Sequence, residues 1–151
     1  MAAKYFSAAD IEEFRDCFYF YAKEKVISDT KLLSTVMRSL GFSPTITEID
    51  QYFKKNEKDN RIDFATFLEV LHQHMEKEKC QQDLLNAFKA FDKNQTGTIS
   101  YNDFYHLLTA TGERLSGSDV DKIFKEAGVS KGQPIKYKEF MKVVLTPLPD
   151  Y

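Results

Sequence analysis

An isoleucine recurs four times along this chain of 151 residues, at intervals of 35, 37 and 36 residues: Ile27, Ile62, Ile99 and Ile135. Five residues after each isoleucine stands a large apolar residue: Leu32, Phe67, Phe104 and Phe140. Further apolar residues follow three or four positions later, which is the spacing of one face of an α-helix. A repeat of this length indicates one supersecondary unit used several times. We therefore predict an all-α fold made of four helix-loop-helix units.

The third repeat contains a loop rich in oxygen-bearing side chains, residues 92–103. Apolar residues at helical spacing precede and follow it, so it connects two predicted helices. A helix-loop-helix calcium site takes its ligands from loop positions 1, 3, 5, 7, 9 and 12 and has a glycine at position 6. The residues at the ligand positions are Asp92, Asn94, Thr96, Thr98, Ser100 and Asp103, and Gly97 stands at position 6. This loop is the candidate metal site of the chain.

Three capping motifs mark helix starts independently of the repeat: Ser7-x-x-Asp10, Thr45-x-x-Glu48 and Ser118-x-x-Asp121. In such a motif, a side-chain oxygen accepts a hydrogen bond from an amide that the first helical turn leaves without a partner. We therefore expect helices to begin near Ala8, Ile46 and Asp119. Three glycines follow apolar-periodic stretches and are expected to end helices: Gly41, Gly112 and Gly128.

The four repeats group into two predicted lobes, residues 1–76 and residues 84–151. The connector between them, residues 77–83, is polar and contains neither glycine nor proline. We expect this connector to be either helical or a solvated hinge.

Charge and composition exclude several classes of function. The net charge is only −2, and neither half of the chain is a basic patch, so no attraction to nucleic acid or to an acidic membrane surface is expected. No apolar run is long enough to cross a membrane, and the first residues lack the apolar core of a signal peptide. The two cysteines, Cys17 and Cys80, do not make a disulfide framework. We expect a cytoplasmic protein without direct membrane insertion.

Several stretches resemble calmodulin and the myosin light chains of the EF-hand superfamily. They are residues 35–41 (TVMRSLG), 91–93 (FDK), 112–115 (GERL) and 119–123 (DVDKI), and the similarity extends over nearly the whole chain. In this superfamily the repeated isoleucine stands at loop position 8 and pairs with its counterpart in a short two-stranded ribbon. The resemblance therefore implies two lobes of two EF-hands each, with short β-pairing between the loops of each lobe.

The first two loops depart from the family pattern because they are too short. The first begins at Ala22, only five residues before Ile27 where the family has seven, and has no carboxylate at position 1. The helix after it matches the family best with one extra residue, which leaves its register open by one. The second begins near Glu57, again five residues before Ile62, and has Thr66 at its last position. Such loops cannot wrap six or seven oxygens around a cation at about 2.3–2.6 Å. The N-terminal lobe is expected to be metal-free.

The fourth loop keeps its full length but has lost its ligands. It runs from Gly128 to Glu139 and has Ser130, Gly132 and Pro134 at positions 3, 5 and 7. A single carboxylate at the last position cannot hold calcium. Only the third loop remains a candidate.

The third loop is itself a poor calcium site. It offers two carboxylates, and Asp103 is one methylene shorter than the glutamate that binds bidentately at position 12. Bidentate binding at that position opens the lobe of a calcium sensor. The favoured interpretation is a loop held by its own hydrogen bonds, with no cofactor required, and the alternative is one weak Ca²⁺ or Mg²⁺ site.

No pattern in the sequence supports an enzyme. There is no glycine-rich phosphate loop, no nucleophile elbow and no HExxH motif. The histidines are His72, His74 and His106. The first two are two positions apart and do not share a helix face, so we interpret all three as solvated surface rather than as metal ligands or catalytic groups.

Binding of a helix is the function that remains. Two amphipathic hands leave an apolar groove that accepts a partner helix, and the resemblance to myosin light chains implies the basic IQ-motif helix of an unconventional myosin heavy chain as that partner. We expect this binding to be largely calcium-independent and the protein to associate with actin-myosin structures through its partner. The alternative is a weak calcium sensor acting through the third loop. Candidate groove residues lie near predicted helix ends: Met37, Leu40, Met75, Leu108, Phe124, Met141 and Leu145.

Overall fold

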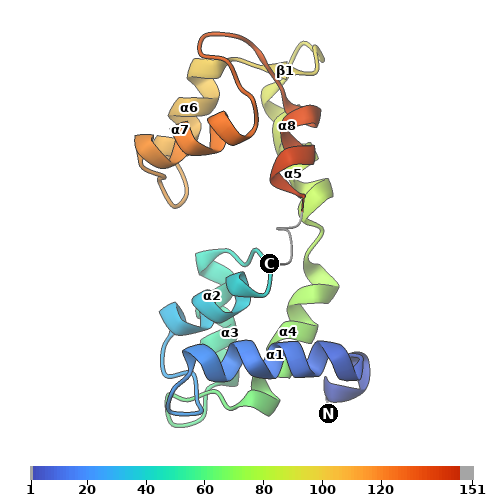
Figure 1. Ribbon diagram of the computed structural model, residues 1–151, viewed down its shortest axis with the longest axis vertical. Coiled ribbons are helices and arrows are strands. Elements are labelled where there is room, and N and C mark those ends of the chain that lie inside the picture. Colours follow the sequence, from blue (N-terminus) through green and yellow to red (C-terminus); the bar gives the residue numbers. More distant parts are fainter. Residues whose placement is uncertain (1, 147–151) are drawn as a thin grey trace. The chain divides into compact units, whose positions relative to one another are not determined.

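The computed structural model describes residues 2–146, and its described part is built of helices (Figure 1). The α-helices are α1 (Ala8–Tyr21), α2 (Thr30–Ser39), α3 (Ile46–Asn56), α4 (Phe64–Lys77), α5 (Cys80–Phe91), α6 (Tyr101–Ala110), α7 (Gly117–Glu126) and α8 (Tyr137–Val144). A short 3-10 helix, η1 (Ala2–Tyr5), precedes them, and two short strands are β1 (Thr98–Ile99) and β2 (Ile135–Lys136). The predicted all-α fold of four helix-loop-helix units is confirmed.

The four repeated isoleucines join the loops in pairs. The Ile27 N–H donates to the Ile62 carbonyl at 2.8 Å, and the Ile62 N–H donates back to the Ile27 carbonyl at 2.9 Å. In the second pair, β1 and β2 are antiparallel and Ile99 lies opposite Ile135. All four side chains are buried. The expected β-pairing between neighbouring loops is therefore present twice.

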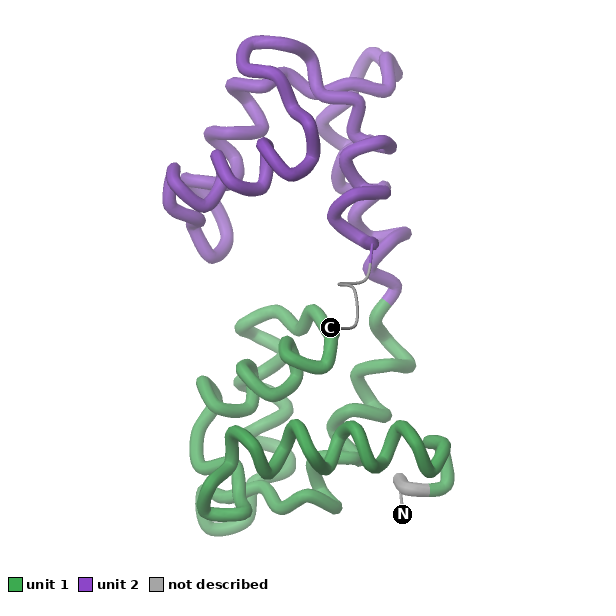
Figure 2. Tube along the Cα trace, in the orientation of Figure 1, with its two compact units in different colours: residues 1–78 green, residues 79–151 purple. Residues whose placement is uncertain are grey.

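The chain divides into two compact units, residues 1–78 and residues 79–151 (Figure 2). Within the predicted connector, residues 77–83, only Glu78 and Lys79 lie outside helices, because α4 extends to Lys77 and α5 begins at Cys80. Residue 1 and residues 147–151 of the predicted lobes lie outside the described residues.

The register of α2 differs by one residue from the repeat. The repeat places Leu32 five residues after Ile27, with the register open by one; Leu32 is half-buried and Leu33 is fully buried. The reason is one extra residue, Ser28, which places the N-cap of α2 at Asp29, two residues after Ile27. In the next two repeats the N-cap directly follows the isoleucine. This settles the register that the sequence left open.

Two of the three predicted helix starts are confirmed as capping boxes. The hydroxyl of Ser7 accepts from the Asp10 N–H at 3.1 Å, and that of Thr45 accepts from the Glu48 N–H at 3.2 Å. The three glycines expected to end helices follow α2, α6 and α7 with positive φ: Gly41, Gly112 and Gly128.

The predicted start of α7 is wrong by two residues. Its N-cap is Ser116, whose hydroxyl accepts from the Asp119 N–H at 3.1 Å and donates to the Asp119 carboxylate at 2.7 Å. The sequence contains two overlapping capping motifs here, and the one that begins at Ser118 lies inside the helix. The earlier start brings Gly117 against α6, where an added Cβ would lie 2.6 Å from the Tyr105 hydroxyl.

Helices pack differently in the two units. In the first unit, α2 packs against both α1 and α3, and α3 packs against α4. In the second unit, α5 packs chiefly against α8 and α6 against α7, so the main helix pairs join different hands (Figure 1). The second unit therefore holds its two hands together through one pair of consecutive helices, α6 and α7, and one pair that is distant in the sequence, α5 and α8.

Candidate functional site

Asp92 is the centre of the third loop, and it is buried, with 7% of the residue exposed. Its Oδ1 accepts hydrogen bonds from the backbone N–H and the hydroxyl of Thr96, both at 2.9 Å. Its Oδ2 accepts from the Gly97 N–H at 2.7 Å and from the Tyr137 hydroxyl at 2.9 Å. Four donors from the protein therefore surround one carboxylate.

A second layer of hydrogen bonds fixes the Thr96 side chain. Its oxygen lies 2.9 Å from the Thr98 hydroxyl and also accepts from the Thr98 N–H at 3.3 Å. Because the Thr96 hydroxyl donates its proton to Asp92, the Thr98 hydroxyl is the donor between the two threonines. The loop is thus connected from position 7 through position 5 to position 1.

The hydrogen bonds determine the direction of the pKa shift at Asp92. Burial alone would raise the pKa of this carboxyl group, but the bonds from Thr96, Gly97 and Tyr137 outweigh it and hold the pKa below its ordinary value. The bond to Asp92 raises the pKa of the Tyr137 phenol, and burial raises it further. At neutral pH, Asp92 is charged and Tyr137 carries its proton.

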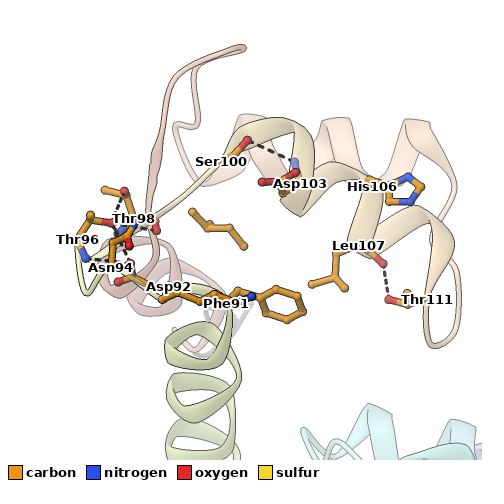
Figure 3. Close-up of a pocket in the computed structure, with 12 residues that line it drawn as sticks. Phe91, Asp92, Asn94, Thr96, Thr98, Ser100, Asp103, His106, Leu107 and Thr111 are labelled. Carbon is orange, nitrogen blue, oxygen red and sulfur yellow. Dashed lines mark hydrogen bonds between the residues drawn. The ribbon is translucent and has the colours of Figure 1, made fainter.

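All six predicted ligand residues line one hollow of about 500 Å³, together with residues such as Phe91 and His106. Figure 3 shows Asn94, Thr96 and Thr98 gathered around Asp92, and Asp103 standing apart from them on α6. Asp103 is exposed, and its N–H lies 3.5 Å from the hydroxyl of Ser100, the N-cap of α6. Hydrogen bonds through Thr96 link positions 1, 5 and 7, and Asp103 at position 12 takes no part in them.

The side chains at the six ligand positions fit a tightly bound cation poorly, because protein groups already occupy the oxygen atoms of Asp92 and Thr96. An ionised carboxylate offers about four lone-pair sites, and four donors already point at Asp92. The Thr96 oxygen is likewise engaged by Thr98. Within residues 2–146, no cluster of three or more His, Cys, Asp or Glu side chains is arranged to hold a metal ion.

The second loop closes as a hairpin turn. Lys58 and Arg61 exchange two backbone hydrogen bonds, at 2.9 and 3.0 Å, and the two residues between them, Asp59 and Asn60, have φ of 54° and 58°. Positive φ at both central residues is the mark of a type I′ turn. The backbone of this shortened loop therefore forms hydrogen bonds within its own turn.

The first and fourth loops also close through backbone bonds. In the first, the Lys25 N–H donates to the Ala22 carbonyl at 2.8 Å, with Lys25 at a φ of 62°. In the fourth, the Gln133 N–H donates to the Ser130 carbonyl at 3.1 Å. Glu139, the carboxylate of the fourth loop, is exposed and lies 3.8 Å from Lys136 Nζ.

The candidate groove residues occupy three different environments. Met37, Phe124 and Met141 are buried in the two cores, with at most 5% of each residue exposed. Leu40, Leu108 and Leu145 are half-buried. Met75 is 47% exposed. Met141 and Leu145, with Leu85, line a hollow of about 470 Å³ between α5 and α8.

The interpretation of the histidines as solvated surface is wrong for His74, which is 1% exposed. Its Nδ1 lies 3.1 Å from the Tyr52 hydroxyl. Its Nε2 lies 3.3 Å from Glu78 Oε2 without hydrogen-bond alignment, and the other oxygen of Glu78 accepts from the Ser43 N–H at 2.7 Å. The signal that could have found it is helical spacing, since His74 follows Phe67 and Leu71 on the buried face of α4.

The other two histidines differ from His74. His72 is half-buried and stacks on Tyr5, with ring centroids 3.8 Å apart, so it is not simply solvated. His106 is exposed, as expected. None of the helices in the described part combines the length and apolar character that crossing a membrane requires.

Comparison with known proteins gives a consistent family. The model of the EF-hand domain pair matches residues 56–109 and residues 81–145. Calmodulin-like protein 4 of Bos taurus and that of Mus musculus are each 34% identical to this chain, over 99% of both chains. The same protein of Xenopus tropicalis is 33% identical, again over 99% of both chains.

A solved structure extends the comparison to three dimensions. The Physarum polycephalum myosin II regulatory domain matches with a TM-score of 0.71 and 28% identity, covering 93% of this chain and 98% of the matched chain. These relatives are calmodulin-like proteins and a myosin regulatory domain, which confirms the expectation that the chain is not an enzyme. The chain belongs to the EF-hand family, within the calmodulin and myosin light chain superfamily.

Proposed function

We propose that this chain is a light-chain-like subunit that binds a basic amphipathic helix, of the IQ-motif type, in an unconventional myosin heavy chain. The observation that carries the proposal is the likeness of nearly the whole chain to a chain of a myosin regulatory domain. A protein of this function would be cytoplasmic and would join actin-myosin structures through its partner.

The second unit offers apolar surface for such a helix. Half-buried apolar side chains come from three of its helices and from the end of the fourth: Leu84 and Leu85 on α5, Leu107 and Leu108 on α6, Ile123 on α7, and Leu145 at the C-cap of α8. An amphipathic helix is recognised by apolar anchors that enter such positions. These residues have apolar area left to bury, which the fully buried Phe124 does not.

We further propose that helix binding is largely independent of calcium. Three loops close by short backbone bonds, and the carboxylate of the third is already surrounded by protein donors. These features support a lobe that needs no metal to reach its folded form, so no cofactor is required. A weak Ca²⁺ or Mg²⁺ site in the third loop remains the alternative function of the loop.

The test is the affinity of a synthetic IQ-type peptide of about two dozen residues, measured by calorimetry in chelator and in calcium. We expect similar affinities in both, because the apolar anchors supply most of the binding energy. Leu108→Ala and Leu145→Ala should each weaken binding by about tenfold, whereas Ile46→Ala, a change at a 59% exposed side chain on α3, should not. Binding that requires calcium would contradict the proposal and favour a sensor.

A further inference from the structure

Tyr137 connects the fourth loop to the centre of the third. It is the first residue of α8 and stands 45 positions after Asp92, yet its hydroxyl donates to Asp92 Oδ2 at 2.9 Å. We propose that this hydroxyl takes the place of a cation: it supplies the last donor to the buried carboxylate, and so holds the second unit in one conformation while no divalent metal is bound. This inference concerns the lobe itself and holds whether or not the partner is a myosin helix.

The capacity of the carboxylate makes the hydroxyl and a cation competitors. Two hydrogen bonds reach each oxygen of Asp92, which uses its roughly four lone-pair sites. A buried charge without such partners is strongly unfavourable, so the donors are required while no ion is present. A cation that binds Asp92 must therefore displace at least one of them.

Tyr137 is the donor whose removal is most informative. The other three donors come from Thr96 and Gly97, inside the loop, and changing them alters the loop itself. Tyr137 is only 4% exposed, and its ring stacks on Phe88 with centroids 5.2 Å apart and an angle of 3°. Phe88 lies one helical turn before Asp92 on α5, so the stacked ring aims the hydroxyl at the carboxylate.

The geometry also explains why the loop does not need position 12. The pairing of Ile99 with Ile135 and the bond from Tyr137 to Asp92 tie the two hands together at two separate points. Neither link uses Asp103, which is exposed and apart from Asp92 (Figure 3). The lobe is therefore closed around the third loop by protein groups alone.

The experiment compares Tyr137→Phe with Tyr101→Phe. The first removes the hydroxyl and keeps the ring stack on Phe88. The second removes a hydroxyl from a half-buried ring of the same unit that stacks on Tyr105. Each variant is melted in chelator and in saturating CaCl₂ or MgCl₂, and its affinity for each cation is measured by calorimetry.

We expect Tyr137→Phe to melt about 4–8 °C lower than the wild type in chelator and to bind the cation about tenfold more tightly, since a competing bond to a charged group is gone. Added cation should then raise its melting temperature more than that of the wild type. The double variant Asp92→Asn, Tyr137→Phe should lose this extra response, which would place the effect at Asp92.

Two results would overturn the inference. One is a cation response of Tyr137→Phe no larger than that of Tyr101→Phe. The other is a cation affinity that rises in Asp103→Glu but not in Tyr137→Phe. That result would mean that the reach of the side chain at position 12 limits cation binding. Neither result bears on peptide binding, so the light-chain proposal stands or falls separately.

Discussion

At the scale of single residues, each unit contains a buried polar or charged side chain that is hydrogen-bonded by a tyrosine hydroxyl. Among the described residues, the buried polar or charged side chains are His74 and Asp92. Burying such a group is costly unless it has a hydrogen-bond partner. In each case a tyrosine hydroxyl is that partner, Tyr52 for His74 and Tyr137 for Asp92. The two tyrosines therefore stabilise the cores through their hydrogen bonds as well as through the packing of their rings.

The first prediction follows for Tyr52. Tyr52→Phe should lower the free energy of unfolding by about 1–3 kcal/mol, because Nδ1 of His74 is left without a partner inside the core. Urea denaturation followed by circular dichroism measures the change. Tyr19→Phe is the matched control, since Tyr19 is 42% exposed and its ring contacts survive the substitution. Equal stability of Tyr52→Phe and the wild type would show that the bond contributes nothing.

Sequence reasoning found some of these residues and missed others for a physical reason. The ligand positions from Asp92 to Asp103 are close in the chain, so their spacing alone brings them around one hollow. Tyr137 contributes to the same site across 45 residues, and no local spacing predicts that contact. The burial of His74 was not predicted because its spacing from His72 says only that the two do not share a helix face; the apolar residues before it, Phe67 and Leu71, place it on the buried face of α4.

At the scale of elements, the loops depart further from the regular repeat than the helices do. Helix starts that depend on one capping box, at Ser7 and Thr45, were predictable. The start of α7 was not, because two overlapping capping motifs, at Ser116 and at Ser118, fit the sequence equally well and the helix begins at the earlier one. The first two loops are each two residues shorter than the family pattern, and each closes through a tight backbone turn.

The second prediction tests the turn in the second loop. Asn60 has a φ of 58°, a conformation that a β-branched residue adopts only with strain. Asn60→Val should therefore lower the free energy of unfolding by about 1–2 kcal/mol, whereas Asn60→Gly should leave it unchanged or raise it slightly.

Denaturant unfolding of the two variants checks this prediction. Lys58→Val is the control, since Lys58 belongs to the same turn but is not among the residues with positive φ. If Asn60→Val and Lys58→Val were equally stable, the left-handed conformation would not limit this loop.

At the scale of the whole molecule, each unit has its own core. Fourteen buried apolar side chains form the core of the first unit and nine form that of the second, among the described residues. Each fully buried large side chain contributes about 1.5–3 kcal/mol, so the second unit should be the less stable. Its half-buried leucines are consistent with this difference, because they have area left for a partner to cover.

The last prediction is that thermal unfolding in chelator shows two transitions, with the second unit melting first. A chain with two separate cores need not unfold in a single step. The substitutions already described identify the transitions, since Tyr137→Phe should lower only the first and Tyr52→Phe only the second. An IQ-type peptide should raise the first transition more, because a ligand stabilises the unit that it binds. Scanning calorimetry with these variants measures all three effects.

Two outcomes would contradict this prediction. A single transition that both substitutions lower equally would mean that the two cores unfold together. A peptide that raises only the temperature of the second transition would bind the first unit.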